Sequence, residues 1–217
     1  MVPLRVALTG QLDTVRDSSR IPPAWRKASS TLSNKKDDPK DPADYRPISL
    51  LCLAGKTLTR VLSDRMLAWA ERRGLLPDNQ GGFRPRRGTV ELVAALRMLL
   101  SMRVAERKRT YACFVDVRKA YDSVWRSALW CKLRDIGASG RVLRLLRQWY
   151  TGTSAHVRWG SQTSRPFATE QGVRQGDTIS PLLYSIFING LVQVLNSRFP
   201  DAIRVRGTLV VGFFFAD

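Results

Sequence analysis

The sequence has few of the residues that build disulfide frameworks and zinc sites. It contains a single histidine, His156, and three widely spaced cysteines that form no C-x-x-C pair, Cys52, Cys113 and Cys131. Disulfide-rich domains need a dense, even set of cysteines, and zinc sites need clustered cysteine and histidine ligands. The sequence therefore argues against both and favours a reducing compartment inside the cell.

Long apolar runs are also absent. No run approaches the ~18 residues that a membrane-spanning helix needs. The N-terminus lacks the charged, apolar and small-residue regions that make up a signal peptide. We therefore expect a soluble intracellular protein that contacts no membrane.

Acidic residues are scarce relative to basic ones. The 217 residues include 36 Lys and Arg but only 18 Asp and Glu, so the formal net charge is +18 and the pI is near 11.0. Such an excess is typical of proteins that neutralise nucleic-acid phosphates and release counterions. A basic surface that only keeps the chain soluble is the alternative. The 44% of hydrophobic residues is enough for a sizeable core.

The hydrophobic spacing predicts an α+β protein. A short N-terminal helix ends before the paired prolines of "IPPAW". Apolar residues at helical spacing then predict further helices over 50–74, from a cap at Thr89 to about 108, and over 127–137, 139–152 and 176–199. A hairpin is predicted over 154–173. Strands are predicted over 110–117, "TYACFVDV", which is apolar enough to be buried on both faces, and over 208–217, "TLVVGFFFAD".

Both of these strands carry a carboxylate at their end, Asp116 and Asp217. A charge at the end of an apolar strand is costly unless it has a partner. If the strands are neighbours, the two acids form a cation site, and Mg²⁺ suits an all-oxygen site that also takes substrate phosphates. Paired metal ions serve phosphoryl transfer, so the acids indicate a nucleic-acid polymerase or nuclease. A cap or a solvated strand end is the alternative for either residue.

An aromatic residue, Tyr121, follows five residues after Asp116 in "DVRKAYDSV". An aromatic side chain beside a metal site can press against the sugar of an incoming nucleotide and exclude a 2′-hydroxyl by its bulk. This favours a polymerase over a nuclease. A position in the hydrophobic core is the alternative interpretation of Tyr121.

Six motifs in family order make the sequence similar to the reverse transcriptase of non-LTR (LINE-type) retrotransposons. They are "IPPAWRKA", "DYRPISLL", "QGGFRPRRGT", "FVDVRKAYDSV", "GVRQGDTISPLLYSIFIN" and the start of an "FADD" box. The resemblance implies an α+β right-hand polymerase fold with fingers and part of an antiparallel palm sheet backed by helices, without the thumb. Residues 1–20 would be an upstream helix or N-terminal extension. Residues 21–217 would be the reverse transcriptase domain, mainly fingers over 21–108 and mainly incomplete palm over 109–217.

The resemblance also implies the catalytic residues. Asp116 matches the aspartate of the first palm strand, and Asp217 matches the first aspartate of the catalytic double-Asp box. Together with the backbone carbonyl of Val117, they would bind two Mg²⁺ ions, with Mn²⁺ as an alternative. Asp122 and Asp177 are interpreted instead as acceptors of local hydrogen bonds at a turn and at a helix start.

Nucleotide and template contacts follow from the same resemblance. Arg46 and Lys36 match fingers residues that hold the triphosphate, and Tyr121 matches the position that discriminates against ribonucleotides. Gln175 and Gly176 match the motif that lines the incoming nucleotide and the template. The basic loop "RPRRG" is expected to contact template phosphates through Arg84, Arg86 and Arg87.

The implied function is RNA-directed DNA polymerisation, with an RNA template, a DNA primer and deoxynucleoside triphosphates as partners, and with the nucleus as the expected location. Since the chain ends after the first Asp of its box and lacks a thumb, we expect it to be weak or inactive alone. One alternative is a decayed, non-catalytic fragment that acts at most as a basic RNA-binding module. Another is a reverse transcriptase of the group II intron type. The oligomeric state is not indicated.

Overall fold

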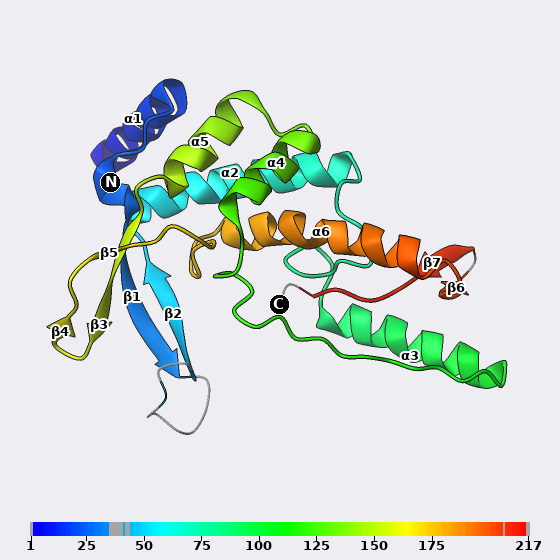
Figure 1. The fold of residues 1–217 in the computed structure, drawn as a ribbon. Coiled ribbons are helices and arrows are strands. Elements are labelled where there is room, and N and C mark those ends of the chain that lie inside the picture. The colour runs from blue at the N-terminus through cyan, green and yellow to red at the C-terminus, as the bar shows by residue number, and fades with distance from the viewer. Residues whose placement is uncertain (1, 35–40, 42–43, 206, 216–217) are drawn as a thin grey trace. The chain divides into compact units, whose positions relative to one another are not determined.

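The computed structural model describes residues 2–34, 41, 44–205 and 207–215 (Figure 1). The chain divides into two compact units. The first unit comprises Met1–Met66 and Tyr121–Ser180, and the second comprises Leu67–Ala120 and Pro181–Asp217. Helix α2, Leu53–Arg72, begins in the first unit and ends in the second.

A mixed sheet forms the strand layer of the first unit. Its order is β2-β1-β3-β4, and β5 also pairs with β3. Figure 1 shows β1 and β2 as adjacent antiparallel arrows, while β3 runs parallel to β1 on its other side. The strands are β1 (Lys27–Asn34), β2 (Tyr45–Leu50), β3 (Ser154–Trp159), β4 (Gln162–Thr163) and β5 (Phe167–Ala168). Strand β2 is therefore an edge strand, and it needs partners for its outward backbone groups.

Helices complete the first unit in the places that the sequence predicts. The predicted N-terminal helix ends at Ser18, ahead of the paired prolines, and Trp25 of the following 3₁₀ turn is buried. Helix α5 presents four buried residues at helical spacing, from Leu145 to Tyr150, because a helix brings positions three and four apart onto one face. These elements are α1 (Val2–Ser18), η1 (Pro23–Arg26), α4 (Arg126–Asp135) and α5 (Gly140–Tyr150).

The second unit holds helix α3 (Thr89–Ala105), all of α6 (Ser180–Arg198) after its first residue, and the hairpin β6 (Ile203–Val205) and β7 (Thr208–Val210). The predicted cap of α3 is displaced by one residue. Gly88 is the N-cap, and its backbone N–H donates to the carboxylate of Glu91 at 2.9 Å. Thr89 is therefore the first helical residue, and the acid in the first turn satisfies the backbone donor before it.

The predicted strand over 110–117 is absent from the structure. Residues 111–117 form no strand, and the side chains of Tyr111, Phe114 and Val115 are 88%, 87% and 79% exposed. No described strand pairs with this segment. Because β-propensity expresses packing against neighbouring strands, an apolar β-branched run without a partner does not form a strand on its own.

The predicted strand over 208–217 is shorter than expected. Strand β7 ends at Val210, and the chain continues as an extended segment to Phe214. Phe214 forms a parallel bridge with Gln80, donating its N–H to the carbonyl of Asn79 at 2.8 Å and accepting from Gly81 at 2.9 Å. The segment before Asp217 therefore lies along the "NQGG" turn, and Asp217 itself is outside the described residues.

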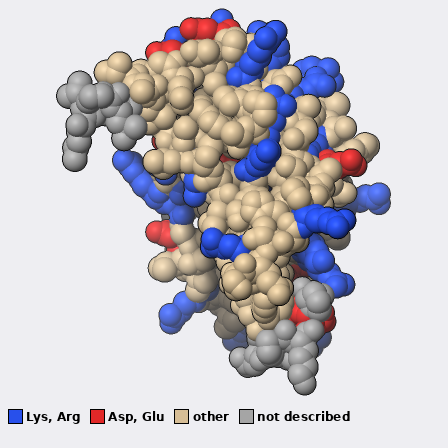
Figure 2. Space-filling view, turned by 90° about the vertical axis from the view of Figure 1, so that its left-hand side faces the viewer, with Lys and Arg blue, Asp and Glu red and all other residues tan. Residues whose placement is uncertain are grey.

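The surface reflects the excess of basic residues. Figure 2 shows Lys and Arg side chains spread over the visible face, with few Asp and Glu side chains between them. Among the helices that the structure describes, none combines the length and the hydropathy that a membrane span requires. The α+β class is confirmed by the mixture of helices and strands.

Candidate nucleotide-binding site

The loop of residues 169–179, between β5 and α6, is bound to the edge of the sheet. The backbone N–H of Ser49 in β2 donates to the carbonyl of Gln175 at 2.7 Å. Gly176 follows with a φ of +109°, and a Cβ there would lie 2.7 Å from the carbonyl oxygen of Ser49. Only glycine allows so close an approach of two backbones. The predicted residues Gln175 and Gly176 are therefore fixed against strand β2.

The same loop also contacts the segment that carries Tyr121. Val173 donates its backbone N–H to the carbonyl of Tyr121 at 2.9 Å, and Gly172 donates to Val124 at 3.0 Å. Gly172 has a φ of +79°, and a Cβ there would lie 2.8 Å from Cα of Asp122. The backbone of Tyr121 is thus bound to Val173, which lies two residues before Gln175 in the loop.

Arg46 lies on the exposed face of β2. In the register of the sheet it is opposite Ser33, and it shares its strand face with Ile48 because side chains alternate along a strand. A Cβ at Gly176 would lie 3.6 Å from Cγ2 of Ile48. Arg46, Tyr121, Gln175 and Gly176 therefore come from neighbouring segments of one compact unit. Lys36, the other predicted triphosphate ligand, lies outside the described residues.

A small cavity lies between the sheet and the loop. Its volume is about 210 Å³, and its loop side includes Asp122, Arg126 and residues from Gln171 to Gln175. Its sheet side consists of Phe167 of β5 and of alternate residues of β1, β2 and β3, namely Ala28, Ser30, Pro47, Ser49, Ala155 and Val157. The loop is therefore supported across one face of the sheet and not only at its edge.

Arg126, the first residue of α4, is surrounded by backbone carbonyls. Its guanidinium donates to carbonyl oxygens at distances from 2.7 to 3.1 Å, namely those of Tyr150, Thr169, Gln171 and Gly172. It also lies 5.0 Å from the centre of the Tyr150 ring. Burial lowers the pKa of Arg126, and three of the four carbonyls belong to the 169–179 loop.

Arg174 and Asp177 attach the far end of the loop to α5. Arg174 is 7% exposed, stacks 4.9 Å from the Trp149 ring, and donates to the carbonyls of Arg26 and Trp149. The indole N–H of Trp149 donates to Oδ2 of Asp177 at 2.6 Å. Burial raises the pKa of Asp177 and lowers that of Arg174. Asp177 thus accepts a bond from a distant helix in addition to any local role.

Sequence reasoning missed Arg126 and the Trp149–Asp177 bond. No residue pattern marks Arg126, because its partners are backbone carbonyls, which every residue has. The sequence did offer a signal for Arg174, because this residue is next to Gln175 in the motif "GVRQGD". The sequence does not show, however, that the Arg174 side chain is buried.

The predicted metal ligands are only partly described. Asp116 is exposed, Val117 is half-buried, and Asp217 lies outside the described residues. Within residues 2–34, 41, 44–205 and 207–215, no group of three or more His, Cys, Asp or Glu side chains gathers as metal ligands do. The pairing of Asp116 with Asp217 therefore stays a prediction.

The predicted template arginines differ in their surroundings. Arg84 is buried and forms a two-pronged ion pair with Glu71, at 2.8 and 2.7 Å, while also donating to the carbonyls of Pro77 and Gln80. These bonds hold the pKa of Glu71 below its usual value. The Arg84 guanidinium is thus buried and fully engaged within the protein, and its contact with a template phosphate stays a prediction. Arg87 pairs with Asp78 at 2.7 Å, and Arg86 is exposed.

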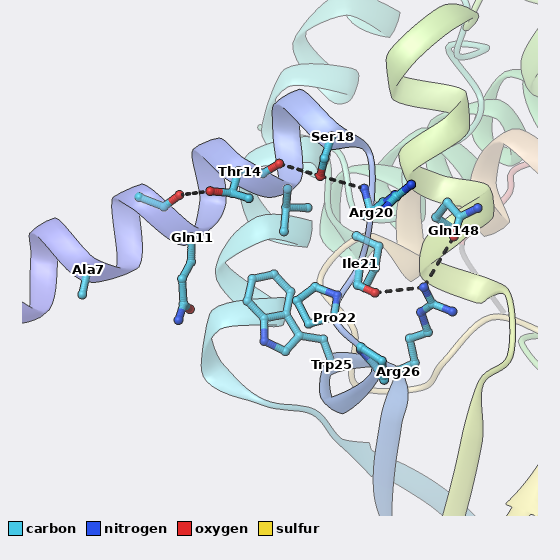
Figure 3. A pocket seen from close by; sticks show the side chains of 13 residues that line it. Ala7, Gln11, Thr14, Ser18, Arg20, Ile21, Pro22, Trp25, Arg26 and Gln148 are labelled. Atoms are coloured by element: carbon cyan, nitrogen blue, oxygen red, sulfur yellow. Dashed lines mark hydrogen bonds between the residues drawn. The ribbon is translucent and has the colours of Figure 1, made fainter.

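A larger cavity, of about 1060 Å³, lies away from the predicted site residues. Helix α1 lines it with Gln11 and Thr14, and the turn after α1 lines it with Ile21 and Trp25 (Figure 3). The guanidinium of Arg26 closes one side by donating to the carbonyl of Ile21 at 2.9 Å. None of the predicted site residues lines this cavity.

Comparison with known proteins identifies similar sequences. The pattern of the family described as reverse transcriptase (RNA-dependent DNA polymerase) matches residues 34–217. The probable RNA-directed DNA polymerase from transposon BS of Drosophila melanogaster is 32% identical over 77% of this chain and 18% of its own length. The RNA-directed DNA polymerase from mobile element jockey of Drosophila funebris is 35% identical over 80% of this chain and 20% of its own. The Pol polyprotein of element R2 from Popillia japonica is 32% identical over 82% of this chain and 24% of its own length. The chain thus spans less than a quarter of each relative.

Proposed function

We propose, because this chain belongs to the reverse transcriptase (RNA-dependent DNA polymerase) family of non-LTR retrotransposons, that it forms the nucleotide-binding part of an RNA-directed DNA polymerase. Its partners would be an RNA template, a DNA primer and deoxynucleoside triphosphates. The +18 charge supports this, since it favours binding to phosphate-rich nucleic acid. We propose a nuclear location on the same basis.

One observation carries the proposal. The 169–179 loop brings Gln175 and Gly176 against β2, which bears Arg46, and brings Val173 against Tyr121. These are the residues that the family motifs assign to the incoming nucleotide, and they lie in one compact unit. The proximity of these segments supports the proposal.

Each of these residues would have a distinct role. The Arg46 guanidinium would pair with triphosphate oxygens, to which its planar donors are suited. Gln175 and Gly176 would line the base, and the exposed backbone of Gly176 leaves room for it. The Tyr121 ring would exclude the 2′-hydroxyl of a ribonucleotide, so that deoxynucleotides are selected.

The metal chemistry would depend on Asp116, Val117 and Asp217. Two carboxylates and a backbone carbonyl offer only oxygen donors, which is the ligand set that Mg²⁺ prefers and Mn²⁺ accepts. The bound ions would favour ionisation of the primer 3′-hydroxyl and neutralise the charge of the departing pyrophosphate. The protein residues would hold the nucleotide, the primer end and the template in line.

The right-hand architecture is part of the proposal. Residues 21–108 would contribute mainly to the fingers and residues 109–217 mainly to the palm, while residues 1–20 would be an upstream helix. The exposed apolar segment 111–117 would then belong to the palm.

A primer-extension assay tests the function. The 217-residue chain, in excess over an oligo(dT) primer on poly(rA), is mixed with dTTP and Mg²⁺, and single-turnover extension is followed. We expect slow extension that a chelator abolishes. Absence of any Mg²⁺-dependent extension would contradict polymerisation by this chain itself.

A non-catalytic RNA-binding module is the second candidate. The exposed position of Asp116 and the high positive charge favour it. RNA binding that falls steeply with salt, together with no Mg²⁺-dependent extension, would support this candidate over the polymerase.

A further inference from the structure

We propose that Arg126 is a positioning residue for the nucleotide site, and that it sets the path of the 169–179 loop so that Gln175 and Gly176 stay against β2. This inference rests on the proposed function for its kinetic consequence. Its structural part, the control of the loop by one guanidinium, stands independently of that function.

The contacts of Arg126 are unusual because they are made almost entirely to main-chain oxygens. Nη1 donates to Thr169 at 2.7 Å and Nε donates to Gly172 at 2.8 Å, so the guanidinium spans the start of the loop. Nη2 donates to the carbonyl of Gln171 at 3.1 Å. Within the described part of the chain, no carboxylate comes within ion-pair distance of this cation. The charge is therefore balanced by the carbonyl dipoles that it gathers.

We call Arg126 and the loop carbonyls that it binds the clamp. The position of the guanidinium in this clamp is also fixed from the helix side. The same Nη1 donates to the carbonyl of Tyr150 at the end of α5, at 3.1 Å, and the guanidinium lies over the Tyr150 ring. The Tyr150 hydroxyl is in turn 3.2 Å from Oγ of Ser180. Arg126 thus connects α4, to which it belongs, and α5, which it contacts at Tyr150, to the loop. The two helices fix its position, and its guanidinium in turn binds the loop.

The clamp binds the loop at Gly172, which precedes the predicted site residues Gln175 and Gly176 in the chain. Gly172, which Arg126 binds through its carbonyl, donates its own N–H to Val124, and Val173 donates to Tyr121. Two residues later, Gln175 accepts from Ser49. Moving the loop at Gly172 therefore displaces both the Tyr121 side and the β2 side of the site.

Lysine cannot replace this function fully. An ammonium group carries three donors on one nitrogen, whereas the guanidinium spreads five N–H donors over a plane. The four carbonyls lie around three different nitrogens of Arg126. We therefore expect Arg126→Lys to retain part of the effect and Arg126→Met to lose it, although both keep a long side-chain stem.

The test combines hydrogen exchange with kinetics on the 217-residue chain. Amide exchange of the peptide covering residues 169–179 is measured by mass spectrometry for the wild type, Arg126→Lys and Arg126→Met. The control is Arg144→Met, which removes one positive charge from an exposed position of α5. Single-turnover extension then gives the apparent KM for dTTP and the maximal rate for each protein, and salt-dependent binding to poly(rA) is followed alongside.

We expect exchange in residues 169–179 to rise in the order wild type, Lys, Met, with Arg144→Met equal to the wild type. The apparent KM should rise about tenfold in Arg126→Met, which corresponds to about 1.4 kcal/mol of nucleotide binding, with a smaller change in maximal rate and in RNA affinity. Unchanged exchange would overturn the clamp, and faster exchange with an unchanged KM would overturn its role at the site. If the wild type extends no primer, the polymerase proposal fails, while the exchange result still decides the clamp. If Arg126→Met does not fold, Arg126→Lys alone decides between these outcomes.

Discussion

The backbone N–H of Ser49 donates to the carbonyl of Gln175 at 2.7 Å, across 126 residues of sequence. Ser49 belongs to an edge strand, whose outward N–H groups would otherwise be unpaired. The loop that follows β5 therefore caps the sheet as well as supplying the predicted nucleotide-binding residues. Stability of the sheet edge and geometry of the site are consequences of the same hydrogen bond.

Replacement of Gly176 by alanine should damage this contact. A Cβ would meet the Ser49 carbonyl at 2.7 Å, and the φ of +109° is unfavourable for any L-residue with a side chain. We expect Gly176→Ala to lower the free energy of unfolding by about 1–3 kcal/mol, measured by urea denaturation.

The matched control is Gly10→Ala in α1. A Cβ there meets no atom within 4 Å, and alanine favours the helix, so the free energy of unfolding should rise by about 0.5–1 kcal/mol. Equal effects of the two substitutions would show that the backbone contact at Gly176 is not important.

Asp177 should make stability depend on pH in an unusual direction. Burial raises its pKa above the ordinary value of 3.8, so the folded protein holds this proton more tightly than the unfolded chain. The contribution of Asp177 to stability is therefore lost as the pH rises from about 4 through the folded-state pKa. Asp177→Asn keeps an oxygen acceptor for Trp149 but does not titrate. We expect the stability of Asp177→Asn, minus that of the wild type, to increase between about pH 4 and about pH 8.

Urea unfolding across this pH range, followed by circular dichroism, measures that difference. A difference that stays constant, or that decreases as the pH rises, would mean that burial does not dominate at Asp177. The direct comparison with the wild type cancels the titration of the remaining carboxylates.

Substitutions at Arg84 and at Arg86 should have different effects, the first on stability and the second on RNA binding. Arg84→Met leaves Glu71 without its buried partner and should lower the free energy of unfolding by about 1–3 kcal/mol, since the Glu71 side chain itself is 33% exposed. Arg86→Met, at an exposed position two residues later, should change stability by less than about 0.5 kcal/mol.

The effect on RNA binding should be larger for Arg86→Met than for Arg84→Met. If Arg86 contacts a template phosphate, its loss should reduce the slope of log affinity against log salt by about 0.7 for single-stranded RNA. An unchanged slope for Arg86→Met would remove this residue from the template-binding surface, and a stable Arg84→Met protein would remove the structural role assigned to the ion pair.

Local signals predicted much of the secondary structure. Helices α2 and α5 follow from apolar spacing within one segment, and the break before Trp25 follows from two prolines. Such signals act over a few residues and need no knowledge of the rest of the chain. Gln175 and Gly176 were singled out by the resemblance to reverse transcriptases, and the structure adds a backbone reason for the glycine, its close approach to Ser49.

Features that depend on distant partners were not predictable. The segment 111–117 has the composition of a buried strand, yet it forms none where no described strand pairs with it. Arg84 is one of three arginines in a basic loop, and only the fold reveals that it points inward to Glu71. Trp149 and Asp177 are 28 residues apart, and nothing in either local pattern indicates their bond.

The most direct test of the proposed polymerase is the substitution Asp116→Asn, measured by Mg²⁺-dependent single-turnover extension of oligo(dT) on poly(rA). The substitution removes a carboxylate and preserves side-chain size at an exposed position, so folding and RNA affinity should not change. The account predicts slow extension by the wild type and a loss of about a hundredfold or more in the variant, the scale of removing a key electrostatic group from an active site. Equal extension by both proteins, or loss of RNA binding without loss of chemistry, would contradict it.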